Sequence, residues 1–202
     1  HHLKKGRYLQ AIEDFDALEA RFPYGEYADK AQLASIYAYF ENQEPESALA
    51  AAERFIQIHP RHPHVDYAYY MRGLIKFSES LTGIDRYLPL TPGERDISSS
   101  REAFFHFEEL IQRFPNSQYA SDARQRMVYL KNILAEHDVM VAQHYMKRKA
   151  YVAALNRSIH LTEQFSDTPF NKEAWILRRD AYQAMGLNDL AKEAEQVLKA
   201  NP

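Results

Sequence analysis

The sequence predicts an all-α fold, arranged as a solenoid of five helical hairpins. The first observation behind this prediction is a pattern of a small residue, a large apolar residue and a helix stop that recurs five times along the chain. The second is a duplicated phrase, because residues 21–31 read RFPYGEYADKA and residues 113–123 read RFPNSQYASDA. The third is the scarcity of strand patterns. Such self-similarity is typical of repeat proteins, in which each unit buries its apolar face against the next.

Each recurrence begins with an alanine, has a large apolar residue seven positions later and ends in a stop eleven or twelve positions after the alanine. Alanine lets two helices approach closely, and the apolar residue two turns on lies on the same helix face. Because proline cannot continue a helix, the stop ends the second helix of one unit and opens the first helix of the next. This arrangement is that of the tetratricopeptide unit, whose period is about 34 residues. The five sets are Ala11, Leu18 and Pro23; Ala48, Phe55 and Pro60; Ala103, Leu110 and Pro115; Ala154, Leu161 and Ser166; and Ala191, Leu198 and Pro202.

The turn inside each hairpin is expected five residues before the alanine. Helix starts follow ordinary capping chemistry: Ser117 and Asp66 are candidate caps, and the serine run at residues 98–100 can cap the helix that holds Ala103. The five turn positions are Gly6, Gln43, Ser98, Lys149 and Gly186.

Two spacings between the repeat alanines exceed the expected length, at 55 and 51 residues against 37 for the other two. The first contains residues 80–100, which are rich in Gly, Pro and Ser and predict a loop inserted in repeat 3. The second contains Ser117–Arg148, which lacks Pro and Gly and predicts one long helix of about 30 residues linking repeats 3 and 4. We therefore expect two domains, residues 1–116 with repeats 1–3 and residues 117–202 with the linking helix and repeats 4–5.

The amino-acid composition limits the classes of protein to which this chain can belong. Hydrophobic residues make up 46% and charged residues 26% of the chain, as in soluble globular proteins, and a net charge of −3 argues against nucleic-acid binding. The absence of cysteine excludes disulfides, thiolate metal sites and cysteine nucleophiles from this stretch. No apolar run approaches the roughly 18–20 residues of a membrane span, and no signal peptide is visible. The chain opens with HHLKKGRYLQAI, which reads as the middle of a helix, so we expect a fragment whose true N-terminus is missing.

Catalytic and metal-binding motifs are absent, so we expect neither an enzyme nor a cofactor. The adjacent carboxylates Glu108 and Glu109 point in different directions on a helix and form no acid–base pair. A histidine-rich stretch raises zinc as an alternative, but its two prolines and incomplete ligand set favour a polar turn between repeats. The residues of that stretch are His59, His62, His64 and Asp66.

Two features of the long helix favour surface roles. His137 and His144 share one face but are about 10 Å apart by helical rise, too far to share a metal ion, so we expect surface or interface residues. Residues 147–149, Lys-Arg-Lys, form the strongest basic run, and a solvated helix end explains it better than a phosphate site.

Tyrosine is abundant, with 14 residues against one tryptophan, and it gathers near repeats 2 and 3. On the first helices of a solenoid, tyrosine can stack on an apolar side chain while its hydroxyl hydrogen-bonds an extended peptide. Most of these aromatic residues are expected to pack between repeats, but those at 67–70 cannot all face one side of a helix. The aromatic residues are Tyr24, Tyr27, Tyr37, Tyr39, Phe40, Tyr67, Tyr69 and Tyr70, and the cations nearby that could meet a carboxylate are Lys30, Arg72 and Lys76.

Four phrases resemble the BamD (ComL) family, the lipoprotein subunit of the β-barrel assembly machinery (BAM complex) in Gram-negative outer membranes. They are YMRGL at 70–74, RFPNSQYASDA at 113–123, VAQHYMKRKAYVAALNR at 141–157 and AYQAMGLNDLA at 181–191. The resemblance covers essentially the whole chain, including the long helix and the insertion in repeat 3.

The resemblance implies a non-catalytic scaffold, tethered to the periplasmic face of the outer membrane by an acylated N-terminal cysteine that lies outside this sequence. The family's C-terminal repeats dock on the POTRA domain of BamA, which implicates Asn156 and Arg157 here. Its N-terminal repeats are expected to receive the C-terminal segment of unfolded barrel proteins, and BamC and BamE are further partners. The groove residues implied are Tyr24, Tyr27, Tyr37, Tyr67 and Arg72. The alternative is a generic tetratricopeptide adaptor or chaperone co-factor that binds peptides.

Overall fold

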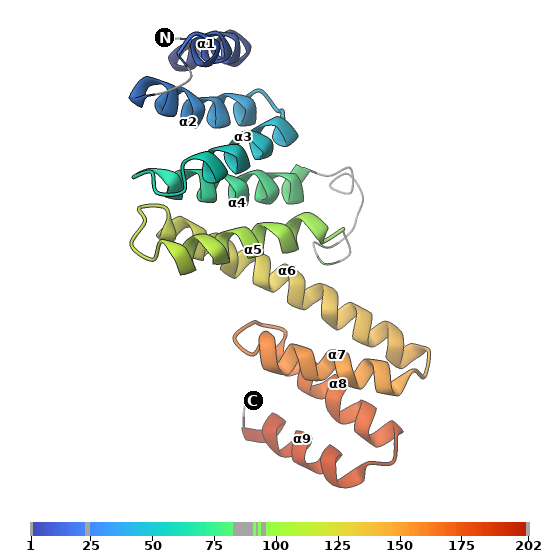
Figure 1. Ribbon diagram of the computed structural model, residues 1–202. Coiled ribbons are helices and arrows are strands. Elements are labelled where there is room, and N and C mark those ends of the chain that lie inside the picture. The colour runs from blue at the N-terminus through green and yellow to red at the C-terminus, as the bar shows by residue number, and fades with distance from the viewer. Residues whose placement is uncertain (1, 23–24, 83–90, 92, 94–95, 201–202) are drawn as a thin grey trace. The chain divides into compact units, whose positions relative to one another are not determined.

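The computed structural model describes residues 2–22, 25–82, 91, 93 and 96–200 (Figure 1). Within these residues every regular element is helical, which confirms the all-α prediction. A short 3₁₀ turn, η1 (Leu3–Lys5), precedes the α-helices. These are α1 (Tyr8–Arg21), α2 (Glu26–Glu41), α3 (Pro45–Ile58), α4 (Val65–Thr82), α5 (Ser98–Arg113), α6 (Ala120–Lys147), α7 (Tyr151–Gln164), α8 (Asn171–Ala184) and α9 (Asn188–Ala200).

The repeat pattern corresponds to helical hairpins of the tetratricopeptide type. The repeat alanines lie in α1, α3, α5, α7 and α9, the second helix of each hairpin, and each is at most 4% exposed. Phe55, Leu110 and Leu161, seven residues after their alanines, are 0–1% exposed. Small residues at the helix contacts and large residues two turns away therefore form the core between repeats, as the spacing predicts.

Contacts divide the chain into two compact units. Unit 1 comprises residues 1–83 and 98–127, and unit 2 comprises residues 84–97 and 128–202. Helix α6, with 28 residues, contributes to both and confirms the predicted long helix. The predicted domains, 1–116 and 117–202, stay a prediction. The predicted insertion at 80–100 overlaps the end of α4 and the start of α5, and residues 83–90, 92 and 94–95 within it lie outside the described part of the chain.

Four of the five predicted turns share one backbone geometry. At each, a residue in the left-handed region ends the first helix, and the next residue donates its N–H to the carbonyl five positions back, as in a Schellman cap. The fifth position, Ser98, begins α5 instead. The four left-handed residues are Gly6 (φ 66°), Gln43 (φ 62°), Lys149 (φ 59°) and Gly186 (φ 75°).

The left-handed conformation disfavours side chains with a Cβ, so Gln43→Gly and Lys149→Gly should each stabilise the protein by about 0.5–1 kcal/mol. Urea denaturation followed by circular dichroism would measure the gain. Gly186→Ala is the matched control, because nothing lies within 4 Å of the position its Cβ would take and any loss must come from the backbone. Equal or lower stability of both glycine variants would contradict the prediction.

Helices α4 and α5 pack closely at Gly73, the glycine of the YMRGL phrase. A Cβ at this position would lie 2.5 Å from both Cδ1 and Cε1 of Phe107. Phe107 is completely buried, so its ring has no empty space into which to move. Gly73 therefore sets the distance between these two helices.

Candidate functional site

Tyrosines of α4 and the start of α6 form a packed cluster in unit 1. The rings of Tyr70 and Tyr119 stack with their centroids 4.7 Å apart, and those of Tyr67 and Tyr119 lie 5.7 Å apart. Tyr67 and Tyr70 share a helix face because they are three residues apart. Ser117 and Asp66, both predicted as helix caps, bond to one another beside the cluster, although Asp66 lies within the first turn of α4: Ser117 Oγ donates to Asp66 Oδ2 at 2.6 Å and accepts the N–H of Tyr119 at 3.2 Å. We call Tyr67, Tyr70 and Tyr119 the tyrosine cluster.

A charged pair on α6 adjoins the tyrosine cluster. Tyr70 Oη donates to Asp122 Oδ2 at 2.7 Å, and Arg126 Nε donates to the same oxygen at 2.6 Å. The Arg126 guanidinium also lies 4.7 Å from the ring centroid of Phe77. Sequence reasoning missed Arg126, although an Asp and an Arg four residues apart on a predicted helix are a recognisable ion pair.

The cluster's hydroxyls keep their protons at neutral pH. Burial raises the pKa of Tyr67, and nearby Tyr119 and Tyr37 raise it further. Burial, and then the hydrogen bond to Asp122, raise the pKa of Tyr70 to about 12. Burial alone would raise the pKa of Asp122, but its hydrogen bonds from Arg126 and Tyr70 lower that pKa below its usual value. The surface thus combines hydrogen-bond donors, ring faces and an ionised pair.

The other predicted groove tyrosines have different surroundings. Tyr27 on α2 is 81% exposed. Tyr37 on the same helix is 39% exposed and packs edge-to-face on Tyr8, with centroids 6.3 Å apart. Tyr24 lies outside the described residues.

The structure does not bring Arg72 to the tyrosine cluster. Arg72 Nη1 donates to Glu109 Oε2 of α5 at 3.0 Å, and its Nε lies 3.9 Å from Glu53 of α3. Arg72 follows Tyr70 by two residues and therefore points to the other side of α4. The cation beside the tyrosines is Arg126.

His106 of α5 lies within reach of the charge of Arg72. Its burial, and to a smaller extent the positive charge of Arg72, lower the pKa of His106 to about 4. Because the pKa in the unfolded chain is about 6.5, neutral His106 favours folding above that pH, and this contribution is lost as the pH falls from about 6.5 towards 4. We expect the melting temperature to decrease over this range, and to decrease less in His106→Gln. Parallel curves for the two proteins, measured by thermal melting at pH 7.0, 5.5 and 4.5, would contradict this.

The histidine-rich stretch forms a polar turn around one carboxylate. His59 Nε2 and His62 Nε2 lie 3.5 and 3.9 Å from the two oxygens of Asp29 on α2. His62 Nδ1 accepts the backbone N–H of His64 at 3.1 Å. Asp66 is engaged elsewhere, with Ser117. In the described part of the chain, no three His, Cys, Asp or Glu side chains are arranged to hold a metal ion.

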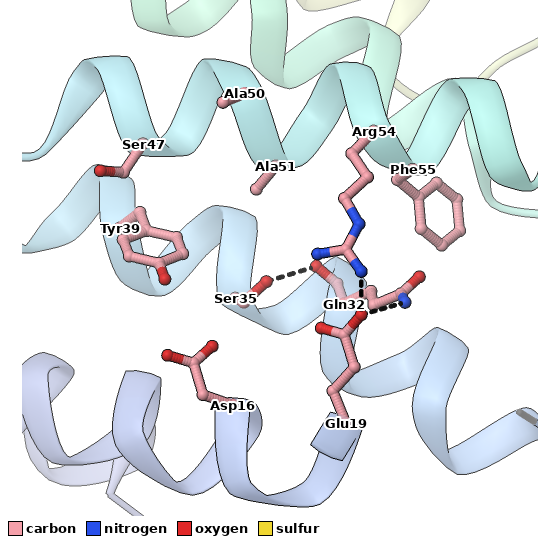
Figure 2. Close-up of a pocket in the computed structure, with 10 residues that line it drawn as sticks. All are labelled: Asp16, Glu19, Gln32, Ser35, Tyr39, Ser47, Ala50, Ala51, Arg54 and Phe55. Atoms are coloured by element: carbon pink, nitrogen blue, oxygen red, sulfur yellow. Dashed lines mark hydrogen bonds and ion pairs between the residues drawn. The ribbon is translucent and has the colours of Figure 1, made fainter. Parts of the chain in front are cut away.

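A small polar pocket of about 290 Å³ lies between α1, α2 and α3 (Figure 2). Glu19 of α1 accepts hydrogen bonds from Gln32 of α2 and Arg54 of α3, so one carboxylate joins three helices. Figure 2 shows the Asp16 carboxylate and the Tyr39 hydroxyl directed into the pocket. Burial, and then the charge of Asp16, raise the pKa of Tyr39. No sequence motif indicated this pocket, because its lining comes from three helices.

In unit 2, Arg157 bonds to a buried carboxylate. Asp138 of α6 is 4% exposed and accepts hydrogen bonds from Arg157 Nη1 at 3.0 Å and His160 Nδ1 at 3.1 Å. The Arg157 side chain is still 36% exposed, and Asn156 beside it is exposed. Asp138 thus fixes the direction of a guanidinium group that partly faces solvent.

Among the described residues, no helix combines the length and apolarity that a membrane span requires.

Comparisons with a family model and with known proteins agree on the family to which this chain is similar. The family described as "YfiO: Outer membrane lipoprotein" matches residues 1–198. The outer membrane protein assembly factor BamD of Neisseria meningitidis serogroup A (strain Z2491) is 41% identical over 199 residues, which cover 98% of this chain and 74% of the relative. The protein of the same name from Vibrio cholerae is 38% identical over 200 residues, covering 99% and 83%, and that from Pasteurella multocida is 40% identical over 200 residues, covering 99% and 77%. With matches across almost its entire length, this chain belongs to the BamD family of outer membrane lipoproteins.

Proposed function

We propose that this protein is a non-catalytic scaffold of the machinery that assembles β-barrel proteins in the outer membrane. The proposal rests on the similarity of almost the whole of this chain to proteins named outer membrane protein assembly factor. A helical-repeat fold supports it, because such folds present extended surfaces to peptides and domains. A lipid anchor, which the description of the family as outer membrane lipoproteins supports, would keep the scaffold at the periplasmic face of the membrane into which barrels are inserted.

Unit 2 would dock on the POTRA domain of BamA through Arg157 and Asn156. Arg157 uses Nη1 for Asp138, and a guanidinium has four further N–H donors with which to pair a partner carboxylate. The internal bond holds the side chain in one direction, which reduces the entropy lost on binding.

A test of docking on the POTRA domain needs a variant of Arg157 that does not destabilise unit 2. Arg157→Glu would set a carboxylate beside buried Asp138 and destabilise unit 2 by itself, whereas Arg157→Gln can still donate to Asp138 while losing its charge. We expect Arg157→Gln to weaken capture by a soluble POTRA fragment about tenfold. Arg179→Gln is the matched control, because Arg179 also joins two helices of unit 2, through Glu195. Equal capture by all three proteins, with unchanged melting temperatures, would remove Arg157 from the interface.

Unit 1 would receive the C-terminal segment of an unfolded barrel protein. The tyrosine cluster offers ring faces and protonated hydroxyls, Tyr37 and exposed Tyr27 extend the aromatic surface, and Arg126 offers a cation for a terminal carboxylate. Arg72 points to the other side of α4 from Tyr70, where it is bound to Glu109, so it would support the helices rather than meet the peptide.

A labelled peptide that copies a barrel C-terminus tests this groove against a scrambled peptide. We expect tighter binding of the true sequence, and a loss of about tenfold in Arg126→Gln. Arg124→Gln, an exposed arginine two residues earlier on α6, should change nothing. Equal binding of the two peptides would favour the generic peptide-binding adaptor, and equal losses at both arginines would exclude a specific groove at Arg126.

A further inference from the structure

The second half of α6 carries apolar residues on two opposite faces. One face belongs to the core of unit 2, where Ala135, Val139 and Ala142 pack with Leu161 and Leu177. The other lines a surface hollow and has the spacing of a single helical stripe, with members three, four, seven, eight and eleven residues after the first. We call it the α6 stripe: His137, Met140, Val141, His144, Tyr145 and Arg148.

Gly93, between α4 and α5, lines this hollow from outside α6. The N–H of Gly93 donates to Glu136 Oε2 at 3.0 Å, and its carbonyl accepts from His137 Nδ1 at 2.8 Å. A Cβ at Gly93 would lie 2.7 Å from Glu136 Cγ and 2.8 Å from the backbone nitrogen of His137. Only glycine fits this close approach, so the backbone of Gly93 itself is held directly against α6.

The hollow, about 620 Å³ in volume, is apolar inside and basic at its edge. Met140, Val141 and Tyr145 are half-buried, which leaves apolar surface in contact with solvent. His144 and Arg148 are exposed beside them, and Lys147 and Lys149 add charge at the same helix end. None of the described residues that line the hollow is acidic. A ligand that complements it has an apolar side chain and a neighbouring carboxylate.

We propose that the α6 stripe and Gly93 form a docking site for a segment of a partner protein in which acidic residues flank a bulky apolar side chain. The apolar side chain enters the hollow over Met140 and Val141, and a carboxylate pairs with Arg148. The site is independent of the proposed function, since it uses neither Arg157 nor the tyrosine cluster. It also brings together the two histidines of the long helix and Arg148 of the basic run.

A fluorescein-labelled ten-residue peptide that alternates aspartate with leucine and phenylalanine is a direct probe, read by fluorescence anisotropy. We expect saturable binding, lost when lysine replaces aspartate or serine replaces the apolar residues. Arg148→Glu should weaken binding at least about tenfold, while Lys147→Glu, the same charge change one residue away and outside the hollow, should weaken it about twofold or less. Equal losses in these two variants would show binding to bulk charge and overturn the proposal.

Met140→Ser and Gly93→Ala test the hollow itself. Both should weaken binding several-fold, the first by removing apolar contact and the second by displacing residue 93 from α6, with tryptophan fluorescence confirming that unit 2 stays folded. Unchanged affinity in both would overturn the proposal, as would binding to vesicles containing phosphatidylglycerol without binding to the peptide.

Discussion

Gly73→Ala should destabilise the protein by about 2 kcal/mol, although alanine is the better helix former. The helix preference for alanine is worth about 0.5–1 kcal/mol. Against it stands a Cβ 2.5 Å from the fully buried ring of Phe107, which can only be accommodated by pushing α4 and α5 apart. Urea denaturation monitored by far-ultraviolet circular dichroism measures the difference.

Phe107→Leu gives the matched test of this explanation. Alone it should destabilise, because it leaves a cavity, but in the Gly73→Ala background it removes the ring that the new methyl group strikes. The double variant should therefore be more stable, by about 1 kcal/mol, than the sum of the single changes predicts. Strict additivity would mean that the two residues do not clash.

Asp138→Ala should lower the stability of unit 2 by about 2–3 kcal/mol. Removing one partner of a fully buried ion pair costs roughly 3–5 kcal/mol, and the lower figure applies here because the partner Arg157 is 36% exposed and can be solvated. The change also removes the acceptor for His160. Trp175 of α8 is the only tryptophan in the sequence, so its fluorescence during urea unfolding reports on unit 2.

Asp138→Asn separates charge from hydrogen bonding. Its amide oxygen can still accept from Arg157, so this variant should lose about half as much as the alanine variant. Asp189→Ala, at a fully exposed carboxylate of α9, is the control and should change stability little. Wild-type stability of Asp138→Ala would show that the buried carboxylate contributes nothing to the fold.

The features predictable from sequence are those set by local chemistry. The repeat alanines had to be buried because helix packing at fixed spacing requires a small residue, and all five are. Four of the five turn positions followed from the same count, including Gln43 and Lys149, whose side chains do not favour the conformation they adopt, whereas Ser98 begins α5. The uninterrupted helical spacing of the linking segment predicted α6.

The details of the sites were harder to predict, because they depend on contacts between distant segments. The family resemblance implies Arg72 as a groove residue, but helical rotation directs its side chain to Glu109, away from Tyr70. Arg126 reaches the cluster from a helix 56 residues further along the chain than Tyr70. The contact of Gly93 with His137 joins residues 44 positions apart, and no local pattern encodes it.

Because the turns share one geometry, the length of the first helix of a hairpin does not affect how the chain reverses after it. Helix α6 has 28 residues and α8 has 14, yet both end in a left-handed residue followed by the same backward hydrogen bond. The first helix of a repeat can therefore be longer by whole helical turns, while the turn after it and the start of the second helix stay the same. Such a junction lets a repeat protein acquire new surface, like the stripe along α6, while it keeps the standard parts of its architecture.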